Sequence, residues 1–278
     1  MAYFDSDIFP YLGKRSLSAI TAPELLEVLR RIEERGAVET AHRVKQVCGQ
    51  LWRYAIATGR ATHDITADLR GALLSTKSGQ MAAITDPKQV GPLLRACDNY
   101  NGTLVVRCAL RLAPLVFVRP GELRAAEWAH IDMKAAEWRY RASKTHTDHI
   151  VPLSTQAIAI LREIYPLTGN GRYVFPSERT RSRPMSDNAI LSAMRRMGIP
   201  KDEMTGHGLR AMACTILQEV LKWPEAVVEH QLAHKVKSPN GTAYNRTAFI
   251  EDRRQMMQQW SDYLDSLRLI MPLLECGH

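Results

Sequence analysis

Apolar residues recur at helical spacing early in the chain and predict its first long helix. The segment Thr21-Ala22-Pro23-Glu24 has the form of a capping box with a proline in the first turn. Apolar side chains then repeat every three or four positions, at Leu25, Leu26, Leu29 and Ile32. Gly36 is the type of residue at which a helix commonly ends. We therefore expect an amphipathic helix between Thr21 and Gly36.

A second helix is expected from about Glu39 to Thr58, with apolar and basic residues at different positions around it. The expected apolar stripe comprises Val44, Val47, Cys48, Leu51 and Tyr54. The basic residues around the remainder are His42, Arg43, Lys45 and Arg53. These four side chains either contact DNA or form an ordinary solvated helix face, and the pattern favours neither interpretation.

A polar stretch near residue 80 predicts a boundary between two domains. Residues 75–81 are polar and contain glycine, and a new helix start follows at Thr85-Asp86-Pro87. We therefore expect one domain at residues 1–80 and a second at residues 84–278. Helices are expected at Pro87–Ala96 and Thr103–Leu112, and a short helix ends near Trp128.

Beyond Trp128 the pattern becomes that of β-strands. Residues Trp138–Arg141 and His149–Leu153 read as two short strands joined by the polar turn Ser143–Asp148. Lys144 lies at the edge of this turn, and His146 and His149 are expected to face solvent or DNA. Further helices are expected at Ser186–Met197, His207–Leu221, Pro224–His234 and Ile250–Leu267. The predicted fold is mainly α-helical with a small antiparallel β-sheet, and the second domain is α+β.

Composition and charge narrow the class of protein. The 278 residues are 45% hydrophobic, and 37 Lys and Arg against 29 Asp and Glu leave a formal charge of +8. This charge favours a polyanionic partner, with nucleic acid as the leading candidate. The first residues do not have the form of a signal peptide, and the longest apolar run, Leu110–Val118, is too short to span a bilayer. Five scattered cysteines indicate no disulfide framework, which fits a reducing cytoplasm.

Several residues offer the groups needed for phosphoryl transfer to a protein hydroxyl. That reaction needs a nucleophile, positive charge beside the nonbridging oxygens and an acid for the departing oxygen. Tyr244 is the candidate nucleophile, and Lys144 is the candidate acid. Arg119 and Arg210 carry planar forks that match phosphate oxygens. Each residue alone could be structural, but His207 lies one helical turn before Arg210 near a helix start, where anions are favoured.

Metal binding is the rival use of the imidazoles. His230 and His234 have the i, i+4 spacing of two ligands on one helix face. Gln231 stands where the helix of a zinc protease carries its glutamate, and no carboxylate cluster resembles a two-metal nuclease site. We therefore expect no metal and no other cofactor.

Four motifs together resemble the tyrosine recombinase family, of the phage integrase type. They are Phe117–Leu123 with Glu127-Trp128, the strand His149–Ser154, the segment Gly206–Ala213, and Gln231–His234 with Ala243–Arg246. The motifs look like those of integrases of prophages and genomic islands, and the similarity covers essentially the whole chain.

The resemblance implies a role for each residue of the phosphoryl-transfer set. Arg119 and Arg210 hold the scissile phosphate, and Tyr244 attacks it to leave a 3′-phosphotyrosyl bond. Lys144 protonates the leaving 5′-oxygen. Because the phosphotyrosine keeps the bond energy, an incoming 5′-hydroxyl reseals the strand without ATP or metal.

The resemblance also implies three supporting residues. His207 is similar to the general acid/base of the family, and His234 is similar to its second phosphate-contacting histidine. Glu122 is similar to the acidic residue that supports the site from behind Arg119.

The family further implies an architecture and a set of partners. A helical core-binding domain, residues 1–80, and a catalytic domain, residues 84–278, form a clamp around double-stranded DNA at an attachment site. A tetramer assembles on DNA, an accessory protein sets the direction of recombination, and the reaction takes place in the cytoplasm of a bacterium. The N-terminal domain that binds arm-type sites in many relatives is expected to be lacking, so that the chain is either a fragment or a shorter protein. The terminal helix, Ile250–Leu267, packs either on its own chain or on a neighbouring protomer.

Two alternative functions remain open at this stage. A type IB topoisomerase uses the same tyrosine, arginines and lysine but rejoins the original strand. A DNA-binding regulator with an inactive site would need none of these groups, although every catalytic position here has a suitable residue. Neither the attachment-site sequence nor the choice between integration and excision follows from the residues.

Overall fold

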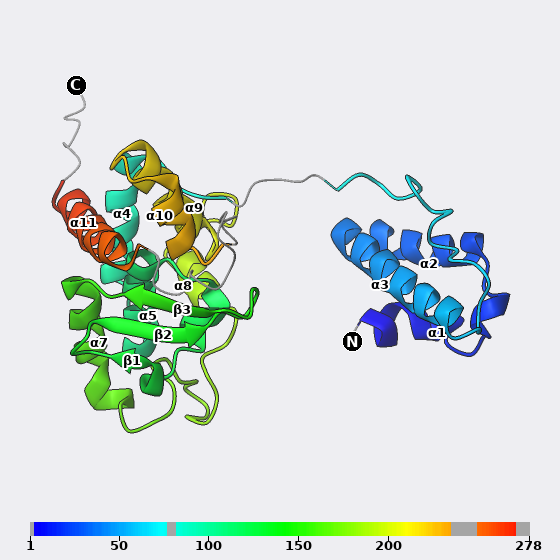
Figure 1. Ribbon diagram of the computed structural model, residues 1–278, viewed down its shortest axis with the longest axis horizontal. Coiled ribbons are helices and arrows are strands. Elements are labelled where there is room, and N and C mark those ends of the chain that lie inside the picture. Colours follow the sequence, from blue (N-terminus) through cyan, green and yellow to red (C-terminus); the bar gives the residue numbers. More distant parts are fainter. Residues whose placement is uncertain (1–2, 77–81, 235–248, 271–278) are drawn as a thin grey trace. The chain divides into compact units, whose positions relative to one another are not determined.

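The computed structural model describes residues 3–76, 82–234 and 249–270 (Figure 1). The chain divides into two compact units, Met1–Gln80 and Met81–His278. Each unit has its own cluster of buried apolar side chains. What each unit does in DNA recognition or catalysis stays a prediction.

Helices α2 and α3 form the centre of the first unit and pack against each other (Figure 1). Helix α2 spans Ala22–Glu34, and α3 spans Val38–Ala57. Three short segments precede them: a π-helix at Phe4–Ile8, α1 at Phe9–Leu12 and a 3₁₀ helix at Leu17–Ala19. Both long helices predicted from apolar spacing are present.

The start of α2 has the predicted capping box. The carboxylate of Glu24 accepts hydrogen bonds from the backbone N–H and the hydroxyl of Thr21, each at 2.8 Å. The backbone bond, followed by the bond from the Arg15 guanidinium, lowers the pKa of Glu24 to about 2. A local sequence signal therefore determines where this helix begins.

The buried face of α3 differs from the predicted one. Its buried residues are Ala41, Val44, Cys48, Gly49, Trp52 and Ala55. Val47, Leu51 and Tyr54 belong to a neighbouring stripe and are 37%, 41% and 61% exposed. The prediction was wrong for these three because α3 carries two adjacent apolar stripes. The stripe that contains the large Trp52 ring is the one that packs against the core.

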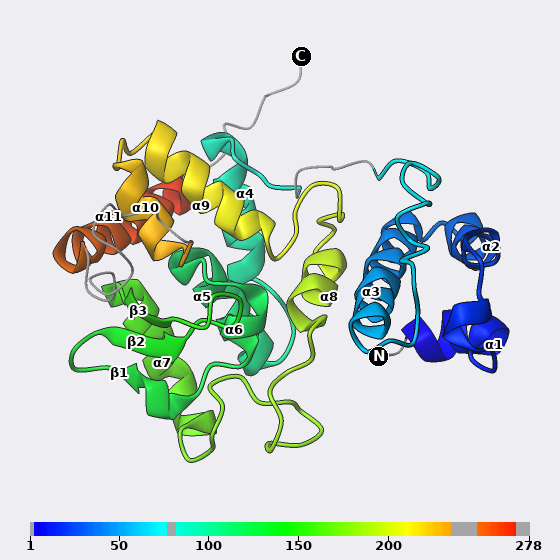
Figure 2. The ribbon, with the colours of Figure 1, turned by 45° about the vertical axis from the view of Figure 1, so that its right-hand side comes forward.

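The second unit is built around α5, Leu104–Val116, whose residues from 108 to 116 are buried apart from Arg111. Its neighbours are α4 (Pro87–Asp98), α7 (Thr155–Thr168), α8 (Ala189–Arg196), α9 (Gly208–Glu219) and α11 (Ile250–Leu269). The short helices α6, Pro120–Arg124, and α10, Glu225–Gln231, follow α5 and α9 in the chain. Figure 2 shows α9 and α10 next to each other, with α8 to the right of α6 in this view.

Helix α7 was not predicted, although its sequence carries the necessary signals. The Ser154 hydroxyl accepts from the backbone N–H of Ala157 at 3.2 Å and caps the helix start. Apolar residues at helical spacing then face the core: Ala157, Ile158, Ile160, Leu161 and Ile164. The cap and the apolar spacing are both local signals, so this helix could have been predicted from the sequence without knowledge of the tertiary structure.

The three strands form one antiparallel sheet in the order β1-β2-β3 (Figure 1). Their bounds are Ile131–Asp132, Glu137–Arg141 and Asp148–Pro152, preceded by a 3₁₀ helix at Trp128–His130. The predicted hairpin of β2 and β3 is confirmed, with Trp138 opposite Val151. His149 faces inward and is 6% exposed, so the prediction that it faces solvent or DNA was wrong.

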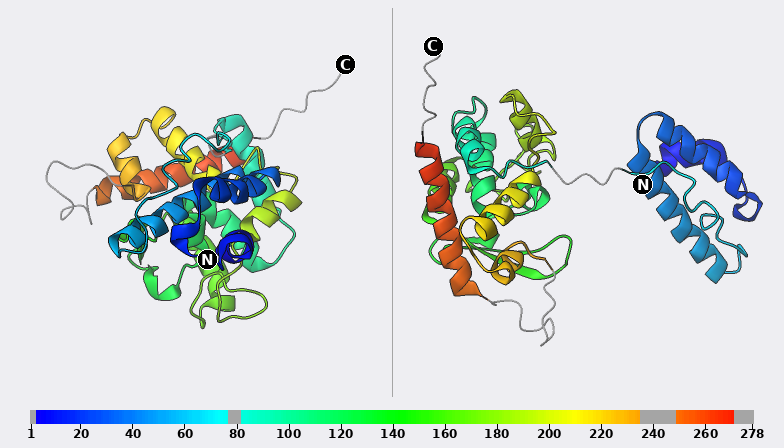
Figure 3. Two further views of the ribbon diagram at one scale, coloured as in Figure 1. Left: turned by 90° about the vertical axis from the view of Figure 1, so that its right-hand side faces the viewer. Right: turned by 90° about the horizontal axis from the view of Figure 1, so that it is seen from above.

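Helix α11 packs on its own chain, which decides between the two arrangements left open by the sequence. Figure 3, right, shows it running along one face of the second unit. Its buried side chains include Met256, Met257, Trp260, Leu264 and Leu267, and the Trp260 indole N–H donates to Pro114 O at 2.9 Å.

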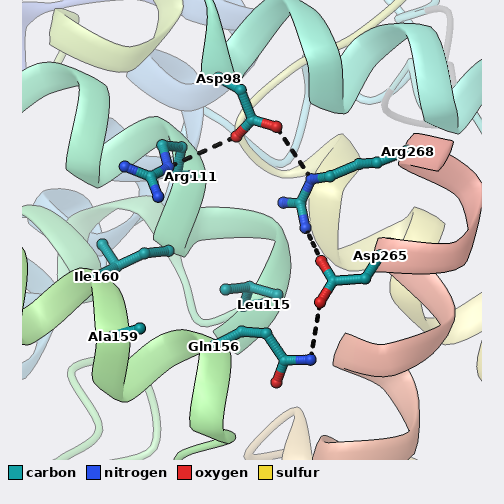
Figure 4. A pocket seen from close by; sticks show the side chains of 8 residues that line it. All are labelled: Asp98, Arg111, Leu115, Gln156, Ala159, Ile160, Asp265 and Arg268. Atoms are coloured by element: carbon teal, nitrogen blue, oxygen red, sulfur yellow. Dashed lines mark hydrogen bonds and ion pairs between the residues drawn. The ribbon is translucent and has the colours of Figure 1, made fainter.

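The end of α11 is held by a chain of ion pairs around a cavity of about 440 Å³ (Figure 4). Asp98 of α4 contacts Arg111 at 3.5 Å and Arg268 at 3.2 Å. Arg268 also pairs with Asp265, which accepts from the Gln156 amide at 2.9 Å. Because these groups are partly solvated, they align the helix end more than they stabilise it. Among the described helices, none is both long and apolar enough to cross a membrane.

Candidate active site

Arg210 is the most deeply buried of the predicted catalytic residues that the structure describes. It lies in the first turn of α9 and is 8% exposed. Its guanidinium donates to Phe117 O at 2.8 Å and to Leu232 O at 2.7 Å. Burial, followed by the nearby Arg119 charge, lowers the pKa of Arg210. Backbone carbonyls from two separate segments therefore hold this side chain in one orientation.

Arg119 lies beside Arg210 and is held in a similar way. It is the N-cap residue of α6, and its guanidinium donates to Glu122 Oε1 at 3.1 Å and to Ala233 O at 3.4 Å. We call Arg119 and Arg210 the arginine clamp. The charge of Arg119 acts on Arg210, so the two guanidinium groups repel each other. This arrangement favours a bound anion beside them.

Strained backbone supports both clamp arginines. Phe117 and Ala233 have positive φ angles of 36° and 51°, although neither is glycine. Phe117 O accepts from Arg210, and Ala233 O accepts from Arg119. Such conformations cost on the order of 1–3 kcal/mol each and occur where the surroundings hold the backbone in place.

Glu122 links Arg119 to the β2–β3 turn that carries Lys144. Its carboxylate accepts from the backbone N–H of Arg119 at 3.2 Å, from the Tyr140 hydroxyl at 2.9 Å and from Ser143 N at 3.2 Å. Burial, followed by the Glu122 charge, raises the pKa of Tyr140 well above its ordinary value. Tyr140 was not among the predicted site residues, although a strand tyrosine two residues from a core tryptophan signals an inward hydroxyl that needs a partner.

His207 and Lys144 are exposed members of the predicted site. His207 immediately precedes α9, and Lys144 lies in the turn between β2 and β3. Burial lowers the pKa of His207, and the charges of Arg210, Arg119 and Lys144 lower it further. These surroundings favour a neutral imidazole, the form that can accept a proton.

His234 bridges the arginine clamp to the carboxylate of Glu229, which was not predicted. Its Nδ1 lies 2.6 Å from Glu229 Oε2, and its Nε2 lies 3.5 Å from Arg210 Nη2. The tautomer with the proton on Nδ1 satisfies both contacts. No sequence signal singled out Glu229, since its role depends on how α10 ends.

The structure therefore brings together Arg119, Glu122, Lys144, His207, Arg210 and His234 from separate segments. Tyr244 falls in residues 235–248, outside the described part of the chain. Its role as nucleophile stays a prediction.

The four basic candidates on α3 differ in their surroundings. Three have partners in the segment that follows the helix: Leu74 O for His42, Leu69 O for Lys45 and Asp64 for Arg53. Arg43 is exposed. The three partnered side chains help to hold residues 64–74 against α3, and contact with DNA stays a prediction for all four.

His149 lies behind the site and predicts an acid-sensitive fold. Its Nε2 lies 3.1 Å from Gln231 O. Burial, followed by the positive charge of Arg253, lowers the pKa of His149 to about 3, and the His230 and Arg210 charges act in the same direction. Between pH 6.5 and 3 the unfolded chain binds a proton that the folded chain does not, so stability falls as the pH falls.

We expect His149 to reduce the free energy of unfolding by about 2 kcal/mol between pH 7 and pH 5. Urea unfolding of the wild type and of His149→Gln at both pH values measures this difference, which the variant should largely lose. His130→Gln, at an exposed position of the same unit, is the matched control and should keep the wild-type difference. Equal pH dependence in wild type and His149→Gln would contradict the prediction.

Within the described residues, no group of three or more His, Cys, Asp or Glu side chains is arranged to hold a metal ion. The site offers cations and imidazoles instead. Guanidinium groups, a lysine and imidazoles gathered in one site suit the binding and transfer of a phosphoryl group.

The fold and this site define the class of the site-specific tyrosine recombinases. Residues 1–72 match the phage integrase central domain, and residues 84–250 match the phage integrase family. The chain therefore belongs to the phage integrase family.

Two curated relatives and one solved structure illustrate the similarity. The putative protein IntB of Escherichia coli K12 is 34% identical over 277 residues, which cover 94% of this chain and 70% of the relative. The integrase of Enterobacteria phage P4 is 32% identical over 284 residues, which cover 96% of this chain and 64% of the relative. A lambda integrase dimer bound to a COC′ core site has the same fold, with a TM-score of 0.63 and 22% identity over 83% of this chain and 84% of that one.

Proposed function

We propose that this chain cleaves and rejoins duplex DNA at a specific site through a 3′-phosphotyrosyl intermediate. The observation that carries the proposal is the arginine clamp, in which carbonyls on strained backbone hold two guanidinium groups beside His207 and His234. Family membership supports the same reaction.

In the proposed cleavage step, the Tyr244 oxygen forms a bond to the scissile phosphorus and the bond to the 5′-oxygen breaks. The phenol proton passes to neutral His207, and Lys144 donates a proton to the departing 5′-oxygen. Arg119 and Arg210 neutralise the nonbridging oxygens as charge develops on them. The products are a phosphotyrosyl ester and a free 5′-hydroxyl.

Rejoining reverses these steps with a 5′-hydroxyl from the same or another strand. The phosphodiester count does not change, so the chemistry needs neither ATP nor a metal ion. Glu122 and His234 act in the proposal as supports of the clamp, through their bonds to Arg119 and Arg210.

The proposal assigns core-type DNA binding to the first unit and catalysis to the second. It also includes a tetramer on DNA, an accessory protein that sets direction, and action in a bacterial cytoplasm. The relatives named for phages and prophages support the setting. A lambda integrase tetramer bound to a Holliday junction, with a TM-score of 0.61, supports the assembly through its fold.

The test is covalent capture of the wild type on nicked suicide duplexes that span candidate attachment sites, in the presence of EDTA. We expect a protein–DNA band on a denaturing gel that carries the 3′-phosphate side of the break. Addition of a second duplex then separates strand exchange from rejoining of the original strand, which a topoisomerase performs. Specific binding of a duplex without any adduct would contradict the proposed chemistry.

A further inference from the structure

Arg253 is a fully buried arginine that the proposed reaction does not use. It lies in the first turn of α11 and is 0% exposed. In the part of the chain that the structure describes, its side-chain hydrogen bonds go to the neutral oxygens of Gln231 and Ile150 and to no carboxylate, and burial lowers its pKa to about 10. Burial of a cation among neutral groups is costly, and an apolar side chain of similar length would avoid that cost.

The guanidinium of Arg253 instead orients the side chain of Gln231 and the carbonyl of Ile150. Its Nε and Nη2 donate to Gln231 Oε1 at 2.9 and 2.7 Å, and Nη2 also donates to Ile150 O. Gln231 is 1% exposed and is the last residue of α10, while Ile150 belongs to β3. One planar fork therefore joins α11, α10 and the sheet.

The chain immediately after Gln231 supplies the contacts of the arginine clamp. Leu232 O accepts from Arg210, and the strained Ala233 offers its carbonyl to Arg119. His234, the next residue, lies against Arg210. A left-handed alanine needs external restraint, and the side chain of Gln231 is anchored two residues before it.

We propose that Arg253 is a positioning residue for the arginine clamp, which it holds through Gln231 and the carbonyls of Leu232 and Ala233. The helix that carries it is itself fixed by the Trp260 bond to Pro114 O. The packing of α11 on the unit and the orientation of the clamp arginines are thus connected through the buried side chains of Arg253 and Gln231. This inference rests on the proposed phosphoryl transfer.

The test compares Arg253→Met, Gln231→Leu and the double variant by covalent capture on a suicide duplex, with full-length chain in excess over DNA. The amplitude reports the fraction of folded protein, and the rate constant reports how well that fraction is aligned. We expect each single variant to reduce the rate constant about 10- to 100-fold, as for a small misplacement of catalytic groups, with DNA affinity within about threefold of wild type. The double variant should be no slower than the slower single variant, because both changes break one connection.

Arg254→Met is the matched control, since the neighbouring Arg254 pairs with Glu137 and Glu251 instead of Gln231. Its rate constant should stay within about twofold of wild type. A loss confined to the amplitude, additive losses in the double variant, or an equal loss in Arg254→Met would overturn the inference. An absence of adduct in the wild type would instead overturn the proposed function, so the two failures are distinguishable.

Discussion

Replacement of Tyr244 by phenylalanine is expected to abolish the covalent protein–DNA adduct, with a loss of about 10⁴-fold or more in the rate of cleavage. Phenylalanine keeps the ring but removes the oxygen that forms the phosphoester, and no other group can take its place without a change of geometry. Phosphate binding depends on the arginine clamp and on basic side chains elsewhere, so DNA affinity should stay within about threefold of wild type.

The measurement is a denaturing gel of suicide-duplex reactions beside a gel-shift titration of the same proteins. Tyr165→Phe is a suitable control. Tyr165 belongs to α7, is 47% exposed, and its ring packs against that of Trp128. An adduct that persists in Tyr244→Phe would assign the nucleophile to another residue. No adduct in either wild type or variant, with equal specific binding, would instead favour the inactive regulator.

Replacement of Arg210 by lysine is expected to reduce cleavage about 100- to 1,000-fold, although the positive charge is kept. The guanidinium donates to Phe117 O and Leu232 O at the same time, and an ammonium group cannot reproduce this fork. A buried carbonyl left without a donor costs on the order of 1–3 kcal/mol, so the free energy of unfolding should also fall.

Single-turnover cleavage and urea unfolding measure the two effects separately. Arg124→Lys serves as control, because Arg124 also donates to a backbone carbonyl, Met185 O at 2.8 Å, but contacts no residue of the clamp. Its cleavage rate should remain within about threefold of wild type. If Arg210→Lys lost stability but cleaved at the control's rate, Arg210 would be a structural arginine and the clamp would need another member.

Local signals predicted much of the fold. The capping box at Thr21 and Glu24 locates the start of α2, and the alternation around Trp138 predicts the β2–β3 hairpin. The same kind of signal at Ser154 marks α7, which was missed. The inward orientation of His149 was not predictable from its place beside a polar turn, because it depends on the packing of α10 and α11 behind β3.

The site divides in the same way. Arg119, Arg210 and His207 stand out in the sequence because their side chains suit phosphate chemistry and their motifs are distinctive. Glu229 and Arg253 carry no such pattern, and the carbonyls of Leu232 and Ala233 are common to every residue type. Their contribution appears only when distant segments meet.

By itself, the sequence determined the helix starts, the hairpin, the family and the residues able to hold and transfer a phosphoryl group, because capping, periodicity and side-chain chemistry are local properties. Only the tertiary structure decided which stripe of α3 is buried and that α11 packs on its own chain. It also decided that strained carbonyls aim both clamp arginines. These features depend on competition among surfaces and on contacts between segments far apart in the chain, and residue order alone does not rank such alternatives.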